Sequence, residues 1–107
     1  MNFLTLSAYV RWFSLLLLVA VLAGCATAPP VQEMSDARQA IAAAKEAGAD
    51  QLAVDQLGRA KLLLQDAETF LMTGNSNAYW QARKAAIEAK EMAFEALLTS
   101  RNAKTAD

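Results

Sequence analysis

The chain has 107 residues, of which 55% are hydrophobic, and a formal net charge of -1. This length allows one domain at most, and the charge gives no indication of nucleic-acid binding. The sequence contains no histidine, which excludes a Ser-His-Asp triad, a Cys-His pair and a histidine-based metal site. Its single cysteine cannot form an internal disulfide.

The N-terminal segment has the layout of a secretory signal peptide. One basic residue, Arg11, precedes an apolar run over residues 12–21, and small residues follow. The run is shorter than the roughly 20 residues that span a bilayer. We therefore expect a signal peptide over residues 1–24. An uncleaved signal anchor extending back to Phe3 is the alternative, although it would bury the guanidinium of Arg11.

The cysteine lies where the apolar run ends. The stretch Leu22-Ala23-Gly24-Cys25 resembles the lipobox of bacterial lipoproteins. In that family a dedicated signal peptidase recognises the three residues before the cysteine, and the cysteine carries acyl chains such as palmitate. The resemblance implies recognition of Leu22, Ala23 and Gly24, cleavage before Cys25, and membrane attachment through Cys25. The alternative is a chance cysteine in an ordinary signal peptide or a membrane helix.

Residues 25–30 are expected to form a short tether after the anchor. Pro29 and Pro30 disfavour helix before them and stiffen this segment. The residue after the cysteine is Ala26, whereas enteric lipoproteins retained in the inner membrane carry aspartate there. The lipoprotein resemblance therefore implies attachment to the outer membrane, facing the periplasm.

The rest of the chain, residues 31–107, is predicted to be a helical domain. Alanine, leucine, glutamate, lysine and glutamine dominate it, and all of them favour helix. Gly48 and Gly74 mark helix ends, because glycine adopts the left-handed conformation at little cost. Three helices are expected at about residues 31–47, 53–73 and 76–102.

Polar residues beside the two glycines are candidate N-caps. Asp50 or Asp55 is expected to start the second helix. Asn75 or Ser76 is expected to cap the third.

Each predicted helix carries a stripe of small and apolar residues at alternating spacings of three and four. This heptad-like period, typical of coiled coils, predicts near-antiparallel packing in an all-α hairpin or three-helix bundle. The stripes comprise Met34, Ala37, Ile41 and Ala44; Leu57, Ala60, Leu64, Ala67 and Leu71; and Tyr79, Ala82, Ala86, Ala89, Ala93 and Ala96. Because alanine buries little area, we expect a thin core in which the first helix packs more loosely than the other two.

The third helix carries a second apolar ridge, formed by Trp80, Ile87, Phe94 and Leu98. This ridge lies more than about 100° around the helix from the alanine stripe. We expect the first helix to cover it and complete the bundle. The alternative is a partly exposed ridge that serves self-association or binding to a partner protein.

The sequence predicts no catalytic, cofactor-binding or metal-binding residues. Glu88, Glu91 and Glu95 form an acidic cluster, but the predicted helices bring no second acidic set to face it. An exposed helix surface explains such a cluster better than a metal or acid–base site does. The sequence also lacks a phosphate-binding loop and a nucleophile paired with a base, so we expect no enzymatic activity.

Two stretches resemble the domain of unknown function 4398 family: AIAAAKEAGADQLAVDQLGRAKLLLQDAE and TGNSNAYWQARKAAIEAKEMA. The resemblance covers about residues 31–97, although family members often have proline where Val54 stands. Proteins of this family are small and bacterial, are commonly lipoproteins, and have no established catalytic residues. The resemblance implies a non-enzymatic, lipid-anchored helical module of the cell envelope that acts in protein interaction or as a structural element. The alternative function is binding of a small apolar or envelope ligand in a helix groove.

Overall fold

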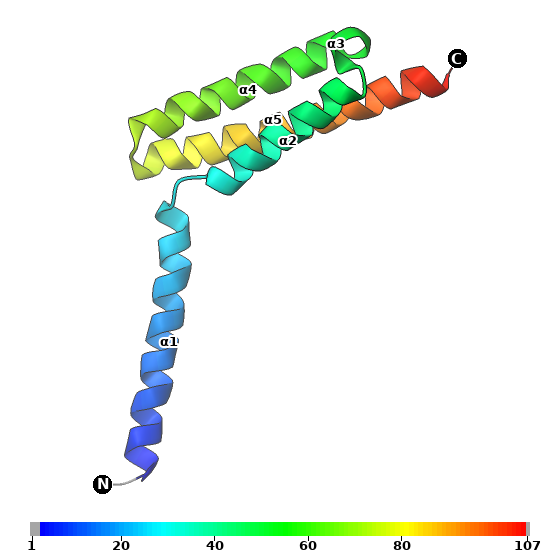
Figure 1. Cartoon of the computed structure of the whole chain (residues 1–107). Coiled ribbons are helices and arrows are strands. Elements are labelled where there is room, and N and C mark those ends of the chain that lie inside the picture. Colours follow the sequence, from blue (N-terminus) through cyan, green and yellow to red (C-terminus); the bar gives the residue numbers. More distant parts are fainter. Residues whose placement is uncertain (1–2, 107) are drawn as a thin grey trace.

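The computed structural model describes residues 3–106, except for the side chains of residues 3 and 21–27. Its elements are the helices α1 (Phe3–Thr27), α2 (Val31–Glu46), α3 (Ala49–Leu52), α4 (Val54–Thr73) and α5 (Ser76–Thr105). Figure 1 shows α2, α4 and α5 packed together, with α1 leading away from them. The all-α prediction with several packed helices is confirmed for the described part of the chain.

The long helix α5 is the centre of the domain. Both α4 and α2 pack along it, whereas α2 and α4 contact each other much less. The side of α5 that faces them is lined by small side chains, which let two helix backbones approach closely. Its buried residues are Ala78, Ala82, Ala85, Ala86, Ala89, Ala93, Ala96 and Ser100.

The predicted stripes form the core. Met34 of α2 and Leu57 of α4 are among the largest fully buried side chains, and each is 2% exposed. Leu64 and Leu71 of α4 pack against the core as partly buried residues. At the C-terminal end of the stripe, Ser100 donates a hydrogen bond from Oγ to the Ala96 carbonyl at 2.8 Å, which satisfies its buried hydroxyl. Most of this core consists of alanine, as expected.

Both glycine positions end a helix as predicted. Gly48 follows α2 with a φ of 93°, and Gly74 follows α4 with a φ of 75°. Such angles are strained for any residue with a Cβ atom. The third helix begins with the expected cap, because the Asn75 side chain accepts a hydrogen bond from the Ala78 backbone N–H at 2.8 Å.

The second helix, α4, begins within one residue of its predicted start, but neither Asp50 nor Asp55 caps it. The chain first forms the one-turn helix α3, which contains Asp50, and then α4, whose first turn contains Asp55. The residue between them, Ala53, is the N-cap of α4, and its methyl group cannot accept a hydrogen bond. Ala53 is 7% exposed and belongs to the core. The N-cap position of α4 is thus a buried core residue without a side-chain cap.

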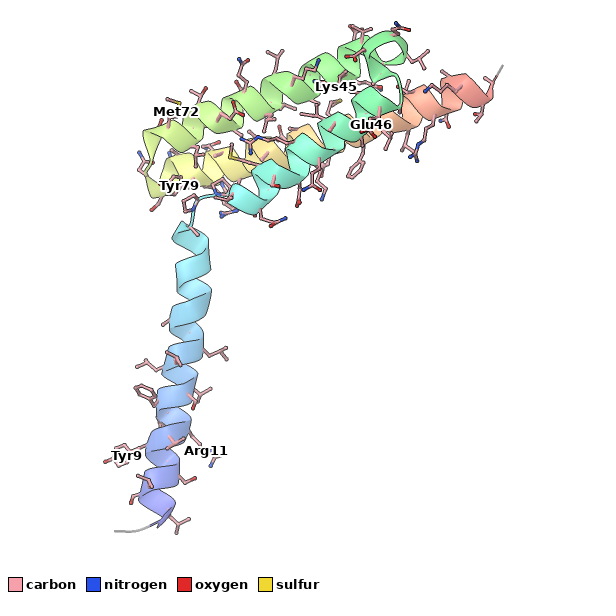
Figure 2. All side chains as sticks on the ribbon, viewed as in Figure 1. Tyr9, Arg11, Lys45, Glu46, Met72 and Tyr79 are labelled. Carbon is pink, nitrogen blue, oxygen red and sulfur yellow. The ribbon has the colours of Figure 1, made fainter. Side chains whose placement is uncertain are left out.

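The segment predicted as a signal peptide corresponds to α1, whose described side chains are exposed. In Figure 2, Tyr9 and Arg11 lie far along α1 from the packed helices. The side chains of Leu22, Ala23, Gly24 and Cys25 lie outside the described residues. Among the described residues, no helix is both long and apolar enough to cross a membrane.

The end of the predicted tether packs against the domain. Arg83 of α5 donates hydrogen bonds from Nη2 to the Ala28 carbonyl at 3.0 Å and from Nε to Glu33 at 3.1 Å. Pro30, the N-cap of α2, is fully buried. Because the Arg83 side chain is only 18% exposed, this arrangement holds the chain in place three residues after Cys25.

Candidate functional site

The ridge on α5 is exposed, which contradicts the expectation that the first helix covers it. Trp80 is 60% exposed, Ile87 42%, Phe94 44% and Leu98 56%. The helix α2 reaches only the edge of this row, where Glu33 and Asp36 line a small hollow with Ile87. Large apolar side chains that stay this exposed in one row form a candidate contact surface. The four residues are called the α5 ridge below.

The reason for the different packing is the width of the alanine surface on α5. Ile41 and Ala44 of α2 pack in one cluster with Ala93 and Ala96. Met34 packs near the start of α2 in a second cluster that includes Ala85 and Ala86. The helix α2 therefore lies beside α4 on the alanine side of α5. The alanine side of α5 is wide enough for both helices to pack on it. The three-helix bundle therefore forms without α2 covering the ridge.

Charged groups of both signs border the α5 ridge. The Lys90 ammonium lies 5.9 Å from the centre of the Phe94 ring, within range of a cation–π interaction. A shallow hollow of about 260 Å³ lies at the start of the ridge, lined by Trp80, Arg83, Lys84, Ile87, Glu88 and Glu91. An apolar row with mixed charges at its border resembles the contact surface of a protein interface.

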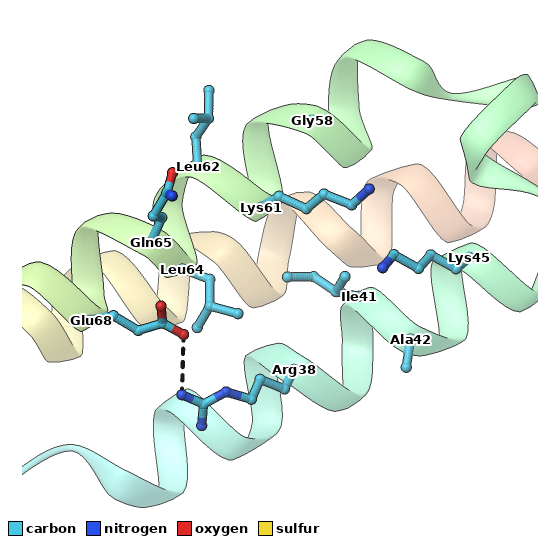
Figure 3. Close-up of a pocket in the computed structure, with 10 residues that line it drawn as sticks. All are labelled: Arg38, Ile41, Ala42, Lys45, Gly58, Lys61, Leu62, Leu64, Gln65 and Glu68. Carbon is cyan, nitrogen blue, oxygen red and sulfur yellow. Dashed lines mark hydrogen bonds and ion pairs between the residues drawn. The ribbon is translucent and has the colours of Figure 1, made fainter.

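A second feature is a groove between α2 and α4, with a volume of about 770 Å³. Its lining consists of Arg38, Ile41, Ala42, Lys45, Gly58, Lys61, Leu62, Leu64, Gln65 and Glu68. Figure 3 shows the Ile41 and Leu64 side chains pointing into the space between the two helices. The groove arises because α2 and α4 both pack on α5 and only partly on each other. We call it the α2–α4 groove.

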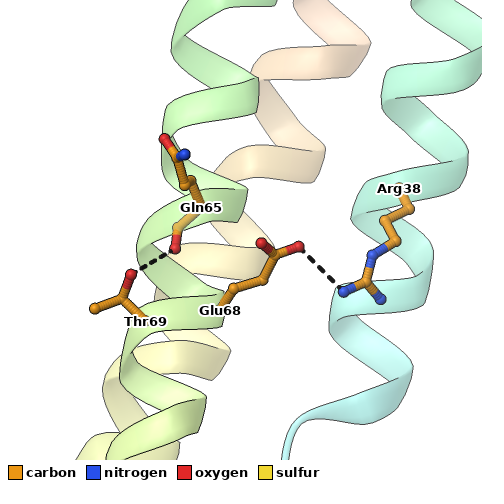
Figure 4. A network of polar contacts seen from close by, with 4 residues as sticks. All are labelled: Arg38, Gln65, Glu68 and Thr69. Atoms are coloured by element: carbon orange, nitrogen blue, oxygen red, sulfur yellow. Dashed lines mark hydrogen bonds and ion pairs between the residues drawn. The ribbon is translucent and has the colours of Figure 1, made fainter.

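An ion pair crosses one end of the α2–α4 groove. Arg38 Nη2 lies 3.3 Å from Glu68 Oε1, and both side chains are about half exposed. Figure 4 shows this pair joining α2 to α4, next to Thr69, which donates a hydrogen bond from Oγ1 to the Gln65 carbonyl at 3.0 Å. Exposed ion pairs contribute about 0–1 kcal/mol, so the Arg38–Glu68 pair shapes the groove more than it stabilises the domain.

The domain that carries the α5 ridge and the α2–α4 groove matches a known protein family. A family model described as a domain of unknown function, DUF4398, matches residues 32–107, which is more than half of the chain. The chain belongs to the DUF4398 family. The matched range contains nearly all of α2 and the whole of α3, α4 and α5, so the DUF4398 domain carries the α5 ridge and the groove. No curated protein and no solved structure matches the chain significantly.

The acidic cluster of the DUF4398 domain lies on the outer side of α5. Glu88, Glu91 and Glu95 are all exposed. Within the part of the chain that the structure describes, no group of three His, Cys, Asp or Glu side chains is placed to hold a metal ion. The expectation of no metal, cofactor or catalytic residue remains a prediction from the sequence.

Ile41 and Leu64 were predicted from the sequence as core stripe residues, and no set of residues was predicted to line this groove. One signal was available in Gly58, a glycine inside an otherwise strong helix-forming stretch. On α2 the lining residues recur at spacings of three, four and seven from Arg38 to Lys45, which places them on one face. The matching face of α4 becomes visible only once the two helices are placed side by side on α5.

Proposed function

We propose that this protein is a lipid-anchored, non-enzymatic interaction module of the bacterial cell envelope. Its anchor is Cys25, acylated after cleavage at Leu22-Ala23-Gly24, and its location is the periplasmic face of the outer membrane. The α5 ridge is the surface through which it contacts an envelope protein or a second copy of itself. The observation that carries the contact role is the exposure of four large apolar side chains in one row.

The proposed anchor is consistent with the short connection between Cys25 and the folded domain. One acyl chain binds a membrane only marginally, whereas two or three chains hold a small domain durably. The contacts of Arg83 with Ala28 and Glu33 leave little free chain after Cys25. The DUF4398 domain would then stand close to the lipid surface with the start of the α5 ridge near the anchor.

The anchor is tested by mass spectrometry of the protein extracted from membranes. We expect an N-terminal cysteine carrying acyl chains, with residues 1–24 removed. The Cys25→Ser variant is the matched control, because it keeps the side-chain size but has no thiol to acylate. It should accumulate at the mass of the unprocessed chain. Recovery of the wild type with Met1 and an unmodified thiol would exclude the proposed anchor.

The contact role of the α5 ridge is tested with Phe94→Asp. Because Phe94 is 44% exposed, the carboxylate stays hydrated and helicity should change little, while self-association or partner binding should fall at least about tenfold. Helicity is measured by circular dichroism, and association by sedimentation of the detergent-solubilised chain and by pull-down from envelopes.

The control for this variant is Met72→Asp on α4, since Met72 is 87% exposed and lies outside the ridge. We expect it to keep both helicity and association. Equal sedimentation and equal partner recovery for the wild type and both variants would contradict the proposal. Unfolding by Phe94→Asp alone would show that the ridge is covered, as was first expected from the sequence.

A further inference from the structure

The α2–α4 groove has an apolar interior with charged groups at its ends. Ile41 is 6% exposed and Leu64 is partly buried, and both side chains point into the groove (Figure 3). From Arg38 to Lys45 the groove follows two turns of α2, a length of about 10 Å at 1.5 Å per residue. Its volume of about 770 Å³ falls within the usual range of small-molecule sites.

The charges of the groove are unbalanced. Its lining holds three cations, Arg38, Lys45 and Lys61, and one anion, Glu68, although the whole chain has a net charge of -1. The anion is already paired with Arg38. The Lys61 ammonium lies 3.8 Å from the exposed carboxylate of Asp50, which is a weak contact.

Lys45 is the third cation of the lining and lies at the end of the groove away from the Arg38–Glu68 pair. Its ammonium forms no hydrogen bond or ion pair with the described residues. Figure 3 shows the Lys45 and Lys61 side chains extending toward each other from the two walls of the groove. Two ammonium groups at one end of an apolar channel form a site that favours an anion attached to a hydrocarbon chain.

Gly58 gives a separate indication that the groove accommodates a ligand. It lies inside α4, where glycine costs about 0.5–1 kcal/mol relative to alanine. A Cβ atom added at Gly58 would meet no atom of the described chain within 4 Å, and its φ lies outside the positive range that requires glycine. Neither local packing nor backbone conformation explains this glycine, but close approach of a bound molecule would.

From these observations we infer that the α2–α4 groove binds a single-chain anionic amphiphile, namely a free long-chain carboxylate. Its carboxylate lies between Lys45 and Lys61. The part of the hydrocarbon chain nearest the carboxylate runs over Ile41 and Leu64 toward the Arg38–Glu68 pair, and the rest of the chain extends past that end of the groove. One channel bordered by two helices accommodates one chain, which favours a free acid over a two-chain phospholipid. This site is independent of the α5 ridge and of Cys25.

The inference is tested by photolabelling the full chain in phosphatidylcholine vesicles with a sixteen-carbon carboxylate that carries a diazirine in its chain. Adducts are located by peptide mass spectrometry, and labelling of α2 and α4 is expressed relative to labelling of α5. We expect adducts around Ile41 and over residues 58–65. Unlabelled palmitate should compete, while neutral monoacylglycerol, phosphatidylglycerol and inorganic phosphate should not.

Two variants identify the site. Lys45→Gln with Lys61→Gln should lower groove labelling about tenfold or more, because charge-assisted hydrogen bonds are lost. Gly58→Leu should lower it by filling the groove, while raising helix propensity, so that folding is retained. The matched control is Lys84→Gln on α5, which should label like the wild type. Circular dichroism checks that every variant is folded.

Three results would overturn the inference. The first is groove labelling that is unchanged in both the double lysine variant and Gly58→Leu. The second is equal competition by the acid and by neutral monoacylglycerol, which would show a site for hydrocarbon alone. The third is competition by phosphatidylglycerol equal to that by palmitate, which would assign the groove to membrane phospholipid. All three readouts are independent of acylation at Cys25.

Discussion

Replacing Leu57 by alanine should lower the free energy of unfolding by about 2–5 kcal/mol, the usual cost of truncating a buried leucine. Leu57 is 2% exposed and packs in the cluster that contains Ala53, Ala60 and Ala93. Alanine neighbours cannot extend into the space left by the lost methyl groups, so a cavity should remain. A single core of this size supplies only about 3–5 kcal/mol. We therefore expect Leu57→Ala to unfold much of the domain at room temperature, measured as lost helicity and a lower urea midpoint.

Leu62→Ala is the matched control for this prediction. It makes the same chemical change in the same helix, but Leu62 is 62% exposed. Its effect on stability should stay within about 0.5 kcal/mol. If the two variants shift the urea midpoint equally, the assignment of α4 faces to core and solvent is wrong.

Ala86→Leu should destabilise the domain by about 1–3 kcal/mol or more, because it inserts a large side chain where three helices meet. Ala86 is 0% exposed and clusters with Met34 of α2 and Ala67 of α4. A leucine there must push α2 or α4 away from α5. The expected result is a lower melting temperature with earlier loss of α2, which hydrogen exchange of the α2 amides would detect.

Ala42→Leu serves as the control for Ala86→Leu, since Ala42 is exposed on α2. The same substitution there should leave the melting temperature almost unchanged, because the new side chain meets no packed neighbour. A stable Ala86→Leu variant would mean that α2 and α4 do not approach α5 as closely as their buried alanines indicate.

The local features of the fold were predictable from the sequence. Helix ends at Gly48 and Gly74 depend on backbone conformation at one residue, and the Asn75 cap depends on atoms three residues apart. The stripes of α2, α4 and α5 follow from helical periodicity, which also depends only on the order of residues. The start of α4 was also predicted to within one residue, although its N-cap is the buried Ala53 and not an aspartate.

The two candidate surfaces differ in how far the sequence determined them. The α5 ridge was visible in the sequence as a row of large apolar residues, namely Trp80, Ile87, Phe94 and Leu98, and all four are exposed in the structure. Whether α2 covers that row depends on how many helices fit on the alanine side of α5. This depends on the space between backbones, which residue order does not contain.

The α2–α4 groove was decided by tertiary structure alone. Lys45 and Lys61 lie on different helices, and each by itself is typical of a solvated helix surface. They form one end of a single groove because α2 and α4 share α5 as a common partner and pack only partly against each other. The sequence by itself thus determined which residues are helical, where two of the helices end and which faces are buried. The angle and spacing of the packed helices determined which exposed residues form a surface together, because that depends on contacts between residues distant in the chain.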